Sequence, residues 1–69
     1  AQGGVDVQID ALREASLEAP TNAKLNYDLA VLLRDEGRKA EAMTEILRAL
    51  EFQPRNPTYR ALRDELQPK

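Results

Sequence analysis

Hydrophobic residues recur at helical spacing along most of this chain, and two such patterns meet at a single glycine. The first pattern occupies residues 23–36 and carries Leu25, Leu29, Leu32 and Leu33, with charged and amide residues between them. Leucines at this spacing predict a helix with one strongly apolar face, which we place on Leu25, Leu29 and Leu32.

The ends of this helix are marked by residues that stop and start helices. Asn22 stands before it, where a side-chain oxygen can accept from the first free backbone N–H groups, and Gly37 stands after it, where a left-handed residue is commonly needed. A second apolar pattern occupies residues 39–53 and stops before Pro54. Because the connection is only about two residues long, the two helices are predicted to fold back as an antiparallel hairpin.

Ala30 on the first predicted helix and Ala42 and Ala49 on the second allow the two backbones to approach closely. With these residues the chain resembles the tetratricopeptide repeat (TPR) family, whose pattern is Trp-x2-Leu-Gly-x2-Tyr, then Ala-x3-Phe, then Pro. Asn26 stands where the family has its large aromatic residue, so we expect one weaker packing contact there. The residues that we assign to the repeat signature are Leu29, Ala30, Leu33, Gly37, Ala42, Ile46, Ala49 and Pro54.

The repeat is echoed on both sides of the central hairpin. Residues 34 positions apart match in type upstream: Leu12 with Ile46, Ala15 with Ala49, and Pro20 with Pro54. Downstream, the offset is 33 residues: Tyr59, Leu62 and Leu66 follow the spacing of Asn26, Leu29 and Leu33. The resemblance therefore covers one full repeat, at about 22–55, with a half repeat on each side.

This resemblance implies an all-α fold of antiparallel helix hairpins, stacked as a fragment of a right-handed superhelix. We expect four helices, at roughly 5–19, 23–36, 39–53 and 57–66, with boundaries uncertain by about two to four residues. Residues 1–4 are predicted to be a flexible tail and residues 67–69 a C-terminal tail. In the last helix we expect Tyr59, Leu62 and Leu66 to face the hairpin, and Arg60 and Asp64 to form an exposed pair. The first helix fits the pattern loosely, and a capping helix and a frayed end are both open interpretations.

The amino-acid composition limits the kinds of catalytic and metal-binding site that the chain can form. The 69 residues are 42% hydrophobic and 32% charged and include no cysteine and no histidine, which is typical of one small helical domain without disulfides or the common zinc sites. We therefore expect no metal, no cofactor and no catalytic residue, and a protein that is not an enzyme. Glu41 and Glu45 share one helix face, and we expect both to be solvated, since neither has a sequence reason to be buried.

Charge and hydropathy also exclude classes of partner. A net charge of −2 gives no basic field for nucleic acid or for an anionic membrane. The longest apolar run, from Leu29 to Leu33, is about five residues, too short for direct membrane insertion. The sequence favours a soluble protein of the cytoplasm and carries no residue that identifies a compartment.

The resemblance implies where a partner would bind, because the first helix of each family repeat lines a concave groove that holds peptides. The residues at groove-facing positions are Lys24, Tyr27, Asp28, Val31, Arg34 and Asp35. Alternatively, Tyr27 and Val31 pack on the preceding helix or on the last one. The interaction surface would then be sought on Arg38, Glu41, Glu45 and Arg48, or at the open ends of the stack.

Two functions follow from these patterns. The first is a non-enzymatic interaction module, part of a larger protein, that presents a TPR-type groove to a peptide or a partner protein. The second is a structural element whose edge helices stack on copies of itself or on neighbouring repeats, so that self-association is expected.

Overall fold

The computed structural model describes residues 4–68, and the side chains of all of these except residue 5. It contains four helices: α1 (Gly4–Glu18), α2 (Ala23–Asp35), α3 (Lys39–Phe52) and α4 (Pro57–Leu66). No strand occurs in this described part, so the predicted all-α fold is confirmed. Residues 1–3 and 69 of the predicted tails lie outside the described residues, and Gly4 is the first residue of α1.

The helix boundaries differ from the predicted ones by one residue at most. The helix α1 begins and ends one residue earlier than expected, α2 and α3 each end one residue earlier, and α4 matches. These shifts are of the size by which fraying and terminal hydrogen bonding blur any helix end.

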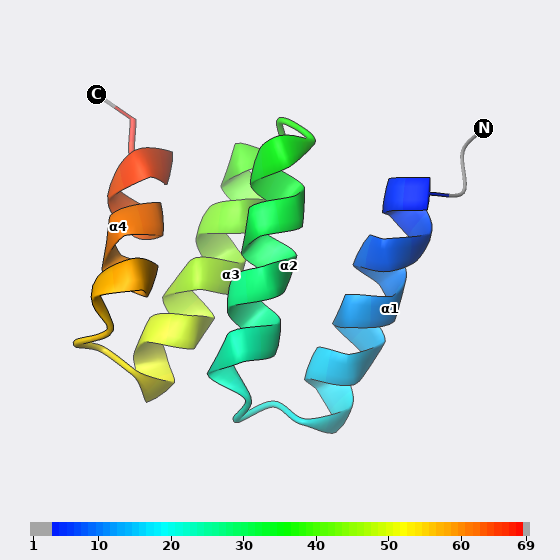
Figure 1. Cartoon of the computed structure of the whole chain (residues 1–69), viewed down its shortest axis with the longest axis horizontal. Helices are drawn as coiled ribbons and strands as arrows, with labels where there is room; N and C mark the ends of the chain where they lie inside the picture. Colours follow the sequence, from blue (N-terminus) through cyan, green and yellow to red (C-terminus); the bar gives the residue numbers. More distant parts are fainter. Residues whose placement is uncertain (1–3, 69) are drawn as a thin grey trace.

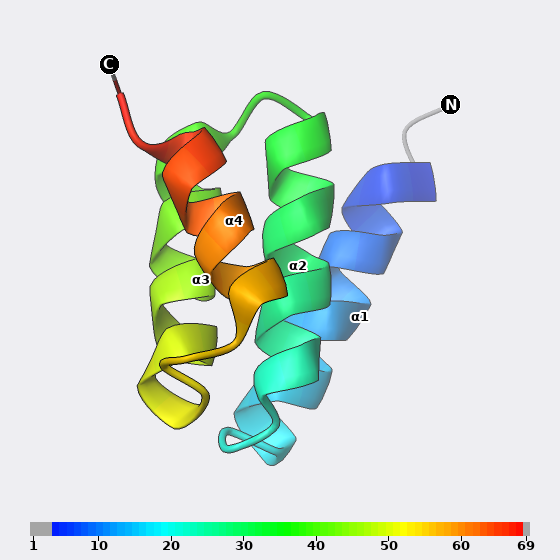
Figure 2. The same cartoon turned by 60° about the vertical axis from the view of Figure 1, so that its left-hand side comes forward.

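The four helices form a thin, stacked arrangement with α2 and α3 as its central hairpin (Figure 1). Successive helices run antiparallel, with α1 on one side of the hairpin and α4 on the other (Figures 1 and 2). The helix α2 makes close backbone contact with every other helix, whereas within the described part α1 contacts neither α3 nor α4 in this way. The molecule measures 37 × 30 × 15 Å, so nearly every helix has one face on the surface.

Asparagine side chains cap α2 and α4 at their N-termini. The Oδ1 atom of Asn22 accepts from the backbone N–H of Leu25 at 3.4 Å, and that of Asn56 accepts from Tyr59 at 3.1 Å. Pro57 follows Asn56 at the start of α4, where its missing N–H would have had no helical partner in any case. Both caps lie where the sequence predicts them.

Gly37 ends α2 in the left-handed conformation that the sequence predicts, with φ at 78°. The N–H of Gly37 donates to the carbonyl of Arg34 at 2.9 Å, and the N–H of Arg38 donates to that of Leu33 at 2.8 Å. These are the two hydrogen bonds of a Schellman motif, and they turn the chain directly into α3.

The core lies between α2 and α3 and is extended by α1 and α4. Ala30, Ala42 and Ala49 are completely buried, which confirms that small residues let the two central helices pack closely. The predicted inward face of α4 is also confirmed. The buried hydrophobic residues are Ile9, Ala23, Leu29, Ala30, Leu33, Ala42, Ile46, Ala49, Leu50, Tyr59, Leu62 and Leu66.

The buried face of α2 is not the one predicted from its leucines. Leu25 and Leu32 are only half-buried, while Asn26 is 1% exposed and lies beside Leu29 and Leu33 in the interior. Packing of α1 against α2 covers this side of the helix, and the Oγ of Ser16 in α1 donates to Oδ1 of Asn26 at 2.6 Å. A buried amide is tolerated because it has this partner.

The prediction that Arg60 and Asp64 form an exposed pair in α4 is also wrong. Asp64 accepts from its neighbour Arg63, with an Nη2–Oδ1 distance of 3.1 Å, and not from Arg60. An adjacent pair at the surface contributes little to stability.

Candidate interaction surfaces

A stacked pair of tyrosines joins α2 to α4. The ring centroids of Tyr27 and Tyr59 are 5.0 Å apart and their planes differ by 25°, an arrangement that favours aromatic pairs. Beside this stack lies a surface hollow of about 410 Å³, which we call the α2/α4 face. It is lined by Tyr27, Arg34, Pro57, Thr58, Ala61, Leu62 and Glu65.

A charged group bridges the two helices on this face. The Nη1 atom of Arg34 lies 3.2 Å from Oε1 of Glu65, and its Nε and Nη2 atoms donate to Oδ1 of Asp35 at 3.1 and 3.0 Å. The hydrogen bonds that Arg34 donates to Asp35 are the main cause that raises the pKa of Arg34 above its ordinary value. The α2/α4 face therefore offers a fixed cation and a carboxylate side by side.

Lys24 and Asp28 form a separate pair on the exposed side of α2. The Nζ atom of Lys24 donates to Oδ2 of Asp28 at 3.0 Å, one turn further along the helix. This hydrogen bond raises the pKa of Lys24. The two side chains form an ion pair with each other, and neither lines the hollow.

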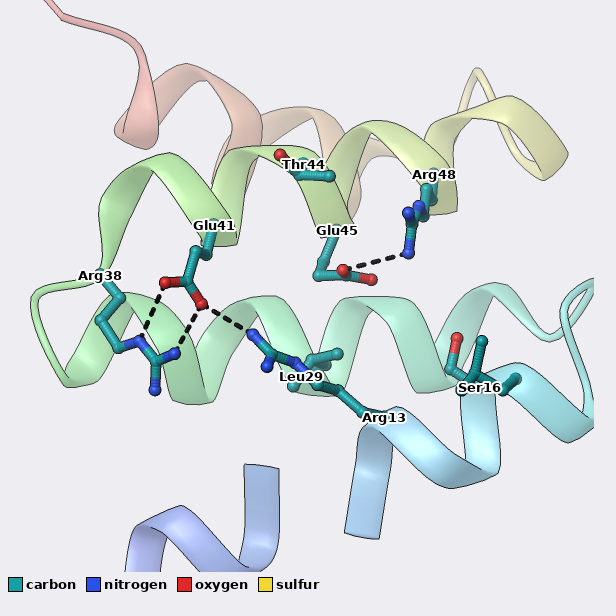
Figure 3. Close-up of a pocket in the computed structure, with 9 residues that line it drawn as sticks. Arg13, Ser16, Leu29, Arg38, Glu41, Thr44, Glu45 and Arg48 are labelled. Atoms are coloured by element: carbon teal, nitrogen blue, oxygen red, sulfur yellow. Dashed lines mark hydrogen bonds and ion pairs between the residues drawn. The ribbon is translucent and has the colours of Figure 1, made fainter. Parts of the chain in front are cut away.

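A second concave region separates α1 from α3, with α2 as its floor (Figure 3). This α1/α3 cleft has a volume of about 460 Å³. Its lining includes Arg38, Glu41, Glu45 and Arg48, the residues that the sequence offers as the alternative surface. The other lining residues are Arg13, Ser16, Leu17, Leu29 and Thr44.

Glu41 spans this cleft through two arginines. Its carboxylate accepts from Nη2 of Arg38 at 2.7 Å and from Nη2 of Arg13 at 2.7 Å, so that α3 is joined to α1 (Figure 3). These partners, Arg38 first, hold the pKa of Glu41 below its ordinary value. Arg13 and Glu41 are far apart in the chain, and only the packing of the helices brings them together.

Glu45 contradicts the expectation that Glu41 and Glu45 are both solvated. The residue is 8% exposed, because it shares the inward side of α3 with Ala42 and Ala49. Its Oε2 accepts from Nη1 of Arg48 at 3.2 Å. Its Oε1 is buried and has no hydrogen-bond partner among the residues that the structure describes.

The family of the chain is settled by comparison with known proteins. The family model described as tetratricopeptide repeat matches residues 9–66, which extend from α1 to the end of α4. The chain belongs to the tetratricopeptide repeat family. Neither the curated proteins nor the solved structures gave a match.

The predicted groove residues of this tetratricopeptide repeat do not converge on one spot. Tyr27 and Arg34 line the α2/α4 face, while Val31 packs, half-buried, against the core. Lys24, Asp28 and Asp35 lie outside the hollow.

The residues that the sequence reasoning missed come from α4. They are Pro57, Thr58, Ala61, Leu62 and Glu65. A signal was present for two of them, since the 33-residue offset that relates Tyr59 to Asn26 also relates Pro57 to Lys24 and Ala61 to Asp28. The same offset relates Thr58, Leu62 and Glu65 to Leu25, Leu29 and Leu32, which are not predicted groove positions.

Members of this family are typically non-catalytic modules that bind proteins. Within residues 4–68, no cluster of acidic side chains has the arrangement that could hold a metal ion. In the same range, no helix combines the length and the apolar character that crossing a membrane requires.

Proposed function

We propose that this tetratricopeptide repeat presents its α2/α4 face to an extended segment of a partner protein or peptide. The observation that carries the proposal is the hollow beside the Tyr27–Tyr59 stack, between the first helices of two successive repeats. The stack fills the space between α2 and α4, so Tyr27 serves the fold as well as the surface. Ala61 and Thr58 are short and exposed, which leaves room above the stack for another chain.

The chemistry of this face suits a peptide. A peptide backbone offers alternating donors and acceptors, and Arg34 and Glu65 supply one group of each kind at the edge of the hollow. The half-buried ring of Tyr27 and the exposed Pro57 supply apolar area. Because Arg34 is already held by Asp35 and Glu65, it is oriented before a ligand arrives, which lowers the entropy cost of binding.

The test is to fill the hollow without touching the core. A peptide selected against the wild-type chain from a displayed library is labelled, and its Kd is measured by fluorescence anisotropy. Ala61→Arg should weaken binding by about tenfold or more, because a long side chain would occupy the hollow. The urea midpoint should be unchanged, since Ala61 is exposed.

Ala11→Arg is the matched control, because Ala11 is an exposed alanine of α1 that lines neither the hollow nor the cleft. It should bind as the wild type does. Equal affinities for Ala61→Arg and the wild type would show that the peptide binds elsewhere.

Self-stacking is the second candidate, favoured by open apolar surface at the α4 end. A hollow of about 700 Å³ there is lined by Lys39, Ala40, Met43, Glu65, Leu66, Gln67 and Pro68. In a longer array the next helix would cover this side of α4. Sedimentation velocity separates the candidates, since stacking requires a mass that rises with concentration and the peptide module is expected to stay monomeric.

A further inference from the structure

One carboxylate oxygen in the wall of the α1/α3 cleft lacks a donor. The side chain of Glu45 is only 10% exposed, and its Oε1 is buried without a partner among the described residues. Figure 3 shows the carboxylate between α3 and the α2 floor, with only its other oxygen bonded to Arg48. A buried acceptor without a donor destabilises the free chain, and a ligand that brings a donor would remove that cost.

We propose that the α1/α3 cleft binds a tryptophan or tyrosine side chain of a partner polypeptide. The indole N–H or phenolic O–H donates to Oε1 of Glu45, and the ring lies in the cleft. No residue that lines this cleft also lines the α2/α4 face, and the proposal stands whether or not that face binds a peptide.

The charges that line the cleft favour an uncharged hydrogen-bond donor on the ligand. Arg13, Arg38 and Arg48 line the cleft together with Glu45. Glu41 is already shared by two of these arginines. A lysine or arginine side chain would have to approach Glu45 past three cations, so a neutral donor is favoured.

The apolar surface of the cleft favours a ligand whose hydrogen-bond donor is part of an aromatic side chain. Leu17 lines the wall with 78% of its surface exposed, and Leu29, itself buried, lies under the floor. A cleft of about 460 Å³ is large enough for a bicyclic ring. Guanidinium groups at the rim can stack on the faces of an aromatic ring. Serine and amide side chains also donate hydrogen bonds, but they have no such ring face.

Access to Oε1 requires one side chain to move. Arg48 is 56% exposed and reaches Glu45 through a single contact of 3.2 Å. The exposed Arg48 side chain can shift toward the face of an entering ring while it still donates to Oε2.

The chain contains no tryptophan, so indole fluorescence reports only on an added ligand. The probes are N-acetyl-tryptophanamide and its 1-methylindole analogue, which lacks the N–H, with N-acetyl-lysinamide as a cationic donor. Titration into the ¹⁵N-labelled full chain is followed by NMR. The tryptophan probe should shift Ser16, Leu17, Leu29 and Glu45, and bind about fivefold or more tighter than the other two probes.

Glu45→Leu removes the acceptor and puts an apolar side chain of similar size in its place. In this variant the tryptophan probe and its methylated analogue should bind equally. Glu14→Leu, a matched change at an exposed position of α1 outside the cleft, should keep the wild-type preference.

The ligand series in the wild-type chain tests the proposal even if Glu45→Leu fails to fold. Equal affinity of the tryptophan probe and its methylated analogue for the wild type would overturn it, as would tighter binding of the lysine probe. Shifts confined to Tyr27, Ala61 and their neighbours would place the ring on the α2/α4 face and would also overturn it.

Discussion

At the scale of single residues, two buried polar side chains distinguish this small core. Asn26 is 1% exposed and Glu45 is 8% exposed. The amide oxygen of Asn26 is satisfied by Ser16, whereas the carboxylate of Glu45 is satisfied at one oxygen only. The difference matters because a buried polar group without a partner costs free energy, whereas a paired one is nearly neutral.

The pairing of Asn26 predicts a non-additive mutant cycle. Ser16→Ala should lower the free energy of unfolding by about 1–2 kcal/mol, because it leaves Oδ1 of Asn26 buried without a donor. Adding Asn26→Leu to Ser16→Ala should recover part of this loss, since no polar group then remains unpaired. Urea denaturation of the wild type, both single variants and the double variant measures the cycle.

Thr44→Ala is the control for this cycle, because it removes an exposed hydroxyl of α3 and should change stability by less than about 0.5 kcal/mol. Losses that simply add in the double variant would contradict a hydrogen bond between Ser16 and Asn26.

At the scale of the helices, local residues set where each element ends. Gly37 has φ at 78° and supports the hydrogen bonds that close α2. A Cβ atom built at this position meets no atom within 4 Å, so the requirement for glycine comes from the backbone conformation and not from crowding.

Gly37→Ala should therefore lower the free energy of unfolding by about 1–2 kcal/mol through the left-handed conformation alone. Gly4→Ala is the matched control, because Gly4 is helical and a Cβ there also meets open space. That change should be neutral or stabilise the chain by up to about 1 kcal/mol, since alanine has less freedom to lose on folding. Urea midpoints of the two variants that moved in the same direction would refute this account of the turn.

At the scale of the whole molecule, α1 is the helix that makes the fewest contacts with the other helices. Among the described residues, α1 makes close backbone contact with α2 alone, and the ion pair of Arg13 with Glu41 joins it to α3 across the cleft. Because Arg38 and Arg13 lower the pKa of Glu41, this carboxylate stabilises the folded state above its unfolded pKa. That contribution is lost as the pH falls through the folded pKa.

The difference in urea midpoint between the wild type and Glu41→Gln should therefore depend on pH. It should be largest near about pH 7 and shrink as the pH falls below about 4.3, the ordinary value for a glutamate, and then through the lowered pKa of Glu41 in the folded state. Glu14→Gln makes the same change at an exposed position of α1 outside the cleft, and its urea midpoint at about pH 7 should stay near that of the wild type. A Glu41→Gln difference that persisted at the acidic end would show that the carboxylate acts through packing.

The sequence by itself determined what depends on neighbours along the chain. The asparagine caps, the left-handed Gly37, the helix spans and the repeat offsets all follow from local hydrogen bonding and side-chain spacing, and they were enough to predict the tetratricopeptide repeat. Tertiary structure alone decided which faces became interior. Asn26 and Glu45 are buried, and Leu25 is half-exposed, because α1 and α3 pack around α2 on sides that its leucine spacing does not specify. It also decided which charges meet, since Arg13 reaches Glu41 only after the helices are stacked, and no periodicity within one helix encodes that contact.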